Sequence, residues 1–346
     1  MTSRNTKPEY SKERVNRAGN AVRAGIETAE DILVIENWRA AHNKILNDWQ
    51  ASLRGRCQGK EIVFAQRLKR RATIFDKLKR QPDMHLSRMH DIAGCRLIFG
   101  NLEQLNEYRE ALHKSWMKHV RRKANSVPYP YDYIANPHPD ESGYRGIHDI
   151  YQYSARPGRD TAWNNLQVEI QYRTKAQHAW ATANEIAGSI TGNHSKFDRG
   201  DERQKEFFCL ASEVISRSEE NLTSCYPSID NQDLVQRFLD TDSDIRLLSQ
   251  LRNLRIASET HDLFKQNIIL VHSDKNENPK VYSYDTLPAA QIKYFQLEKE
   301  MGNTHDIVLV RAPSQENLRQ AYKNYFSDTK DFTRLIDTGL QYLRQN

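Results

Sequence analysis

The chain has 346 residues, of which 38% are apolar and 28% charged, and its mean hydropathy is −0.82. A chain of this length is expected to form two domains, or one large domain, with a core that needs no disulfides. No segment approaches the roughly 20 consecutive apolar residues of a membrane span, which excludes a transmembrane protein. The polar N-terminus lacks the apolar core of a secretion signal, so we expect a cytoplasmic location.

The net charge of +6 is unevenly distributed along the chain. Residues 1–225 contain 36 lysines and arginines against 28 acidic residues, whereas residues 226–346 contain 15 against 17. Residues 54–80 alone carry ten basic residues and two acidic ones. This density suits a polyphosphate or the backbone of a nucleic acid, and a solvated helix face would produce the same pattern.

The first half of the chain predicts strand and helix segments in succession. Residues 1–30 carry glycines and many charges and are expected to be frayed, whereas apolar residues at helical spacing predict an amphipathic helix over 32–49. The elements expected after it are strands at 62–69, 95–99, 147–153 and 166–173, and helices at 72–80, 102–116 and from Lys175 onward.

The second half predicts a helical connector and then a small αβ unit. The connector consists of helices near 201–223, 232–250 and 253–266. The αβ unit consists of strands at 267–273, 280–286 and 305–312, with helices at 292–302 and 316–326.

Four segments combine charged or aromatic side chains with strand ends and turns. They are QRLK with Arg67 and Lys69, HDIAGCR with Asp91 and Arg96, the 20-residue stretch 132–151 with Tyr144, Arg145 and His148, and VEIQYRT with Glu169, Gln171 and Arg173. Period-two alternation places the last three side chains on one face of a strand.

These residue types indicate nucleotide chemistry. Two carboxylates from separate strands, Asp91 and Glu169, suit Mg²⁺, which takes one or two protein carboxylates together with substrate phosphates. Arginine side chains bind phosphate in a bidentate manner and stack on bases. Each residue alone also has a structural explanation, because an aspartate before a strand is commonly a cap and Tyr144 could be a packing tyrosine.

Taken in order, the four segments resemble the synthetase domain of the RelA/SpoT family over roughly residues 55–190. That family moves the β,γ-pyrophosphate of ATP as a unit onto a 3′-hydroxyl. The remainder resembles the fused toxin–antitoxin branch called CapRel, in which a pseudo-zinc-finger domain follows the synthetase domain. The segment DIVLVRAPSQENLRQAYKNYFSD resembles that domain and holds its Tyr-x-x-Tyr motif as Tyr322 and Tyr325. The lack of cysteines after Cys225 agrees with a finger that has lost its metal.

The resemblance implies an α+β fold, with a mixed-sheet, nucleotidyltransferase-like synthetase domain flanked by helices. A helical connector and a small αβ pseudo-zinc-finger domain would follow it. The boundaries we expect are an N-terminal helical region at 1–54, the synthetase domain at 55–225, the connector at 226–266, and the pseudo-zinc-finger antitoxin domain with a C-terminal helix at 267–346.

The resemblance also assigns roles to the candidate residues. Arg67 and Arg96 would hold the two faces of the ATP adenine, and Lys69 would hold the phosphates. Asp91 and Glu169 would bind Mg²⁺, and Glu169 would activate the acceptor hydroxyl. The acceptor would be bound by Tyr144, which stacks on its base, together with Arg145, His148, Gln171 and Arg173.

One departure bears on the acceptor. The stretch 132–151 corresponds to the acceptor loop of the family. Where many alarmone synthetases have a lysine after the Asn-Pro of this loop, this chain has His138, and the loop is longer through Asp140 and Glu141. These differences count against a free guanosine nucleotide as acceptor. In toxic members of the family the acceptor is the 3′-terminal adenosine of the tRNA CCA end, which can no longer be aminoacylated once it is pyrophosphorylated.

A second basic cluster precedes the acceptor loop and suits such an RNA end. It consists of Lys118, Arg121, Arg122 and Lys123, with Tyr129, Tyr131 and Tyr133 close behind. Cations beside aromatic rings are typical of surfaces that bind single-stranded nucleic acid. A solvent-facing helix end beside core tyrosines would give the same pattern.

The resemblance to the CapRel branch implies that the Tyr-x-x-Tyr motif docks over the ATP site. A phage protein, such as the major capsid protein, would release it by binding the C-terminal region. Tyr322 and Tyr325 would share one helix face and could instead pack into the small domain's core. The favoured function is thus a self-inhibited ATP:tRNA pyrophosphotransferase of phage defence, with no membrane partner and a monomer as one option. The alternatives are an alarmone synthetase acting on GDP or GTP, and an inactive RNA-binding module.

Overall fold

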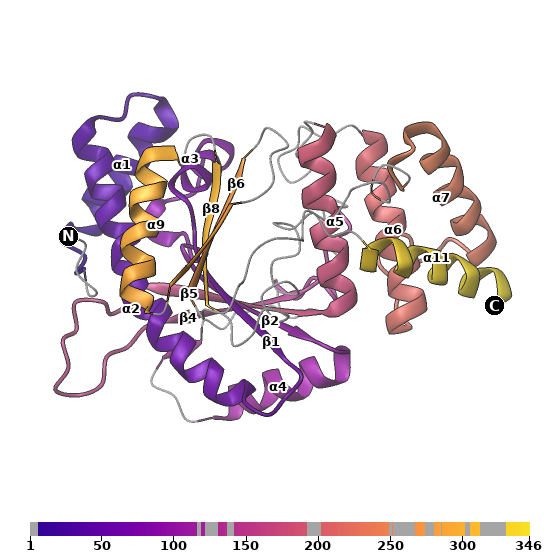
Figure 1. Ribbon diagram of the computed structural model, residues 1–346, viewed down its shortest axis with the longest axis horizontal. Helices are drawn as coiled ribbons and strands as arrows, with labels where there is room; N and C mark the ends of the chain where they lie inside the picture. The colour runs from indigo at the N-terminus through magenta and orange to yellow at the C-terminus, as the bar shows by residue number, and fades with distance from the viewer. Residues whose placement is uncertain are drawn as a thin grey trace.

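The computed structural model describes residues 6–115, 119–121, 131–136, 142–191, 202–248, 251, 267–273, 280–284, 286–301, 305–311 and 330–346. Within them lie a five-stranded sheet, a three-stranded sheet and two sets of helices (Figure 1). The predicted α+β class with a mixed sheet is confirmed. None of the helices among these residues is both long enough and apolar enough to cross a bilayer.

Two helices open the chain, α1 (Lys12–Ala24) and α2 (Ala29–Cys57). The expectation of a frayed N-terminus is wrong over α1. The Ser11 hydroxyl caps this helix by accepting from the Arg14 amide at 3.2 Å, and the Arg14 guanidinium donates to Asp31 in α2 at 2.6 Å. The predicted helix at 32–49 is confirmed, and a capping box of Thr28 and Asp31 starts it earlier, at Ala29.

The larger sheet has the order β1-β2-β5-β4-β3. Strands β2 and β5 run parallel, and the other neighbouring pairs are antiparallel. Its strands are β1 (Val63–Leu68), β2 (Ala93–Phe99), β3 (Val120–Arg121), β4 (Ile147–Gln152) and β5 (Gln167–Thr174). Between them lie α3 (Arg71–Arg80), the short 3₁₀ helix η1 (Leu86–Arg88) and α4 (Leu102–Lys114). The predicted strands of this region are confirmed to within a few residues.

One face of this sheet is covered by α2 and α4, which lie beneath it in Figure 1. Its strands send apolar and aromatic side chains into the main core, where the Trp49 and Tyr151 rings lie 4.5 Å apart and those of Phe99 and Tyr108 5.4 Å apart. Because side chains alternate along a strand, the opposite face receives the polar residues. We call the first the core face and the second the site face.

A helical group follows β5 and contains α5 (Lys175–Thr191), α6 (Glu202–Glu220), α7 (Asn231–Ile245) and α11 (Lys330–Gln345). Phe207, Phe238 and Phe332 lie in its core, so the C-terminal helix packs on α6 and α7. The first two predicted connector helices are confirmed with shifted ends. The third, at 253–266, lies outside the described residues.

The smaller sheet has the order β7-β6-β8 and is antiparallel. Its strands are β6 (Asn267–Ser273), β7 (Lys280–Tyr284) and β8 (His305–Arg311), with α9 (Leu287–Met301) between β7 and β8. Strand β8 lies close to β1, and α9 lies beside α2 (Figure 1). The predicted helix at 316–326, with Tyr322 and Tyr325, lies outside the described residues.

Candidate active site

Four strands place the predicted residues on the site face of the larger sheet. Strand β5 contributes Glu169, Gln171 and Arg173 by period-two alternation. In register with them, Arg96 on β2 and His148 on β4 both lie beside Gln171. Strand β1 adds Arg67 opposite Gly94, the residue that lies beside Glu169. The sheet therefore brings together residues that are more than 100 positions apart.

The Glu169 carboxylate is buried in the middle of this cluster. Its Oε1 accepts from Gln171 Nε2 at 2.7 Å, and its Oε2 lies 3.4 Å from His90 Nε2 and 3.6 Å from His148 Nδ1. Burial alone would raise the pKa of Glu169, but the two imidazoles hold it well below its ordinary range. Glu169 is therefore an ionised acceptor. The prediction did not include His90, although it directly precedes Asp91 in HDIAGCR.

Asp91 lies between two lysines at the start of β2. Its Oδ2 is 2.7 Å from Lys69 Nζ, and its Oδ1 is 3.1 Å from Lys77 Nζ. Burial would raise the pKa of Asp91, and the lysine charges lower it while the nearby Glu169 charge opposes them. Lys77 is a site residue that the sequence reasoning missed within the basic run 54–80. Burial lowers the pKa of Lys69, and the nearby Arg67 charge acts in the same direction.

Tyr144 and Arg173 form a platform beside Glu169. The Tyr144 hydroxyl lies 2.6 Å from His148 Nε2 and accepts from Arg173 Nε at 3.2 Å, while the Arg173 guanidinium lies 5.0 Å from the centre of the tyrosine ring. Burial would raise the pKa of Tyr144, yet Arg173 and His148 lower it to about 8. Burial would lower the pKa of His148, yet Tyr144 and Glu169 raise it to about 9.

The Gln171 amide joins Arg96 of β2 to Glu169 and Arg173 of β5. Its Oε1 accepts from Arg96 Nε and from Arg173 Nη2, each at 3.4 Å, while its Nε2 donates to Glu169. The residue predicted for ATP adenine on β2 is thus joined through one amide to the residues predicted for the acceptor.

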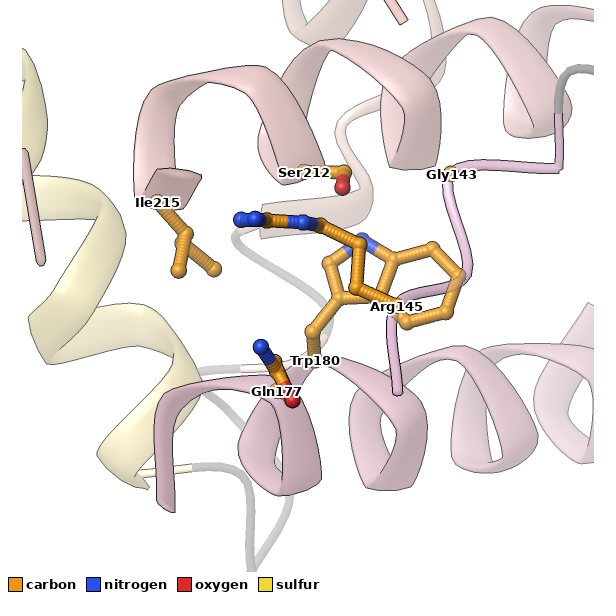
Figure 2. Close-up of a pocket in the computed structure, with 6 residues that line it drawn as sticks. All are labelled: Gly143, Arg145, Gln177, Trp180, Ser212 and Ile215. Atoms are coloured by element: carbon orange, nitrogen blue, oxygen red, sulfur yellow. The ribbon is translucent and has the colours of Figure 1, made fainter. Parts of the chain in front are cut away.

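Arg145 does not join this cluster. Its side chain extends between α5 and α6, where it lies beside Trp180 and Ile215 (Figure 2). There it is buried and pairs with Glu220 at the end of α6. The structure thus places the charge of Arg145 among the helices and away from the cluster, and its predicted contact with the acceptor stays a prediction.

Of the basic cluster predicted for RNA, only Arg121 belongs to the described residues. It lies in β3, where its Nη1 is 2.8 Å from His113 Nδ1. Lys118, Arg122 and Lys123 lie outside the part of the chain that the structure describes.

The two carboxylates fit the magnesium ion that the resemblance implies. Neighbouring positive charges hold the pKa of each carboxyl below its ordinary value, so both are ionised. The charge of Glu169 also acts on Asp91. No cluster of three or more histidine, cysteine, aspartate or glutamate side chains with metal-site geometry occurs within the described ranges. Two carboxylates are the usual protein share of a magnesium site, where substrate phosphates and waters supply the other oxygens. Asp91 and Glu169 would hold the ion, and it would neutralise phosphate charge.

Comparison with known proteins places the same stretch in a family. Residues 66–189 match the family described as the region found in RelA / SpoT proteins. An uncharacterized protein of Mycobacterium tuberculosis is 27% identical over 199 residues, which cover 57% of this chain and 66% of that protein. A similar protein from Mycobacterium bovis has the same identity and coverage. The chain thus spans about two thirds of the length of these curated relatives.

Solved structures of small alarmone synthetases also resemble part of the chain. Small alarmone synthetase 1 from Bacillus subtilis is 27% identical with a TM-score of 0.41, and the match covers 56% of this chain and 92% of that one. The matched family region contains Glu169, Asp91 and the other clustered residues of β1, β2, β4 and β5. Residues 66–189 thus match the region found in RelA / SpoT proteins, and this match supports a pyrophosphotransferase activity with ATP as donor.

Proposed function

We propose that the protein transfers the β,γ-pyrophosphate of ATP to the 3′-hydroxyl of the 3′-terminal adenosine of tRNA. The observation that carries this proposal is the position of Glu169. Its ionised carboxylate lies on the site face between the Asp91–Lys69 pair and the platform of Tyr144 and Arg173. One acceptor for a hydroxyl proton thus separates a group of phosphate-binding cations from a surface on which a base can stack.

The reaction needs positioning and charge neutralisation more than covalent work by the protein. The acceptor 3′-oxygen attacks the β-phosphorus, the bond between that phosphorus and the bridging oxygen of the α-phosphate breaks, and AMP leaves. Lys69 and Lys77 supply two cations for the phosphates, and the Glu169 carboxylate accepts the proton of the attacking hydroxyl. General-base assistance of this kind contributes typically 10²- to 10⁴-fold.

The choice of tRNA rests on the acceptor loop and on the basic residues before it. His138 replaces the lysine of many alarmone synthetases, and the added loop residues include Asp140 and Glu141. The second candidate is an alarmone synthetase that makes ppGpp or pppGpp from GDP or GTP. The family of residues 66–189 favours it, because that family includes such synthetases.

A labelling assay separates the two candidates. The purified chain is incubated with γ-labelled ATP, Mg²⁺ and one of GDP, GTP or deacylated tRNA, and the label is followed to the acceptor. We expect label on the tRNA 3′ end. A tRNA whose terminal ribose has been oxidised is the matched control, because it lacks the 3′-hydroxyl. Label on GDP or GTP alone would replace the first candidate with the second.

We also propose that the C-terminal unit restrains this activity and that a phage protein, such as a major capsid protein, releases it. Contacts between α9 and α2 support the restraint. Arg39 in α2 donates to the Tyr294 hydroxyl at 2.6 Å and pairs with Glu298, while its Nε donates to the Lys69 carbonyl at 2.7 Å. The Glu298 carboxylate also accepts from the Arg71 amide at 3.3 Å. The C-terminal unit thus contacts the backbone beside the phosphate-binding Lys69.

Toxicity tests the restraint. Moving a two-state equilibrium from 1:99 to 99:1 takes about 5.5 kcal/mol of differential binding, which a partner interface of ordinary size could supply. We expect Tyr325→Ala to make expression toxic without any trigger, measured as colony counts after induction. Tyr342→Ala, a half-exposed tyrosine of α11, is the control. Normal growth of cells with the Tyr325 variant would contradict the restraint by this motif.

A further inference from the structure

The segment 143–146 lies between the active site and the helical group. Gly143 has φ +75°, and a Cβ on it would lie 2.9 Å from the Phe208 carbonyl oxygen and 3.0 Å from the Trp180 ring. The segment is therefore pressed against α5 and α6. The Tyr144 hydroxyl lies 2.6 Å from His148 in the site, and its ring also contacts Trp180. The Arg145 side chain extends between α5 and α6 (Figure 2).

Glu220 receives the Arg145 charge and joins three parts of the fold. Its Oε2 pairs with Arg145, and its Oε1 accepts from Thr174 Oγ1 at 3.0 Å and from Gln177 Nε2 at 2.8 Å. Thr174 is the last residue of β5, and Gln177 lies in the first turn of α5. One carboxylate thus connects the acceptor segment to the end of the strand that carries Glu169.

Burial acts against both charges of this pair. It lowers the pKa of Arg145 and raises the pKa of Glu220, while the charge of each partner acts in the opposite direction. Removing one partner would leave the other charge buried and uncompensated, which is strongly destabilising for the local structure.

The cavity beside Arg145 is too small for the substrate. It has a volume of about 10 Å³, which is room for about one water molecule, and is lined by Trp180 and Ile215 together with Gln177 and Ser212. Sites for small molecules measure roughly 300–1,000 Å³. We therefore assign no nucleotide to this cavity.

We propose that Arg145 is a positioning residue, which fixes segment 143–146 through Glu220 and thereby sets the place of the Tyr144 ring, without touching the acceptor. This inference rests on the proposed function, in which Tyr144 stacks on the acceptor base. Displacing a binding group by about 1 Å can cost on the order of 10²-fold in rate. Loss of the pair should therefore weaken acceptor use while ATP binding stays as it was.

Steady-state kinetics of Arg145→Gln, Glu220→Gln and the double variant test the proposal. We expect both single variants to raise the KM for the labelled acceptor by about 10- to 100-fold, with the KM for ATP unchanged. The double variant should lose no more than either single variant, because it removes both charges together. Arg237→Gln is the matched control, since it removes an arginine–carboxylate pair with Glu206 elsewhere on α6 and should behave as wild type.

Two results would overturn the proposal. A normal acceptor KM in Glu220→Gln beside a raised one in Arg145→Gln would show that the arginine contacts the acceptor directly. An equal rise in the KM for ATP would show general damage to the domain.

Hydrogen exchange supplies a readout that does not depend on catalysis. The peptide that spans residues 142–148 should exchange faster in both single variants, while peptides of α2 and β2 keep their wild-type rates. Unchanged exchange in this peptide would contradict the proposal even in a variant that folds poorly elsewhere. If the wild-type protein labels no acceptor at all, the proposed function fails, and the exchange result still decides whether the pair holds the segment.

Discussion

The two faces of the larger sheet treat buried charge differently, and strand β4 shows the contrast between adjacent residues. His148 points to the site face, and Asp149 points to the core face. The Asp149 carboxylate accepts from Arg109 Nε at 3.1 Å and Nη2 at 2.8 Å, and it lies 2.6 Å from His113 Nε2. On the site face, Glu169 has one short hydrogen bond and two imidazoles at 3.4 and 3.6 Å.

Asp149 and Glu169 therefore differ more in the geometry of their partners than in the direction of their pKa shifts. Burial would raise the pKa of both Asp149 and Glu169, and basic neighbours lower both. Arg109 binds Asp149 in a bidentate manner and His113 makes a short contact with it, so the partners of this carboxylate lie within the fold. The partners of Glu169 and Asp91 are histidines and lysines that a phosphate or a metal ion can engage instead. Matched substitutions on the two faces sharpen this comparison.

The largest expected effect is that of Glu169→Gln. The amide keeps the size of the side chain but cannot accept the proton of the attacking hydroxyl, so transfer should fall by about 10²- to 10⁴-fold. Single-turnover transfer from labelled ATP measures the loss. Asp149→Asn is the matched carboxylate-to-amide control on the core face, and its folded fraction should retain the wild-type rate. Wild-type transfer by Glu169→Gln would remove this carboxylate from the mechanism.

The next largest effect concerns Lys77, one of the two lysines that pair with Asp91. Lys77→Ala removes a cation from the phosphate region, and a charged hydrogen bond of this type is worth roughly 1.5–3 kcal/mol. We expect the KM for ATP to rise by about 10- to 100-fold while the KM for the acceptor is unchanged. Lys114→Ala, which removes an exposed pair with Glu110, is the control. An unchanged KM for ATP would leave Lys77 as a structural partner of Asp91.

Much of this arrangement could be predicted from local pattern. The alternation of VEIQYRT places Glu169, Gln171 and Arg173 on one face, and the strands and most helices follow from periodicity. Helix α1 was missed because its charges and Gly19 hide a short helix that depends on contacts between Arg14 and α2.

The remaining differences depend on contacts that no local pattern contains. His90 and Lys77 have no signal of their own, since their roles come from proximity to Glu169 and Asp91. The direction of Arg145 depends on the backbone at Gly143 and on Glu220, which lies 75 positions away in the sequence.

A smaller effect concerns stability on the core face. His113 and Arg109 lower the pKa of Asp149 from an ordinary 3.8 to about 2, although burial acts in the opposite direction. Because the folded state has the lower pKa, this carboxylate contributes stability that is present above about pH 4 and is lost as the pH falls towards 2. The difference corresponds to about 2 kcal/mol at neutral pH. Urea unfolding of Asp149→Asn should show a lower free energy of unfolding at pH 7 than the wild type. This free energy should also fall less as the pH is lowered from 7 to 2. A fall identical to that of the wild type would place the acid sensitivity elsewhere.

The smallest effect concerns the hydroxyl of Tyr144 on the site face. Its pKa of about 8 lies below the ordinary value of 10, because the charges of Arg173 and His148 outweigh burial. Burial instead raises the pKa of Tyr172 on the core face, beside Asp149. The absorbance of tyrosinate should therefore show one early step near pH 8 in the wild-type protein and lack it in Tyr144→Phe. Because phenylalanine keeps the stacking ring, the acceptor KM of this variant should change only about two- to three-fold. If the early step persists in Tyr144→Phe, it belongs to another tyrosine. The charge of Arg173 would then not lower the pKa of Tyr144, and this difference between the two faces would be lost.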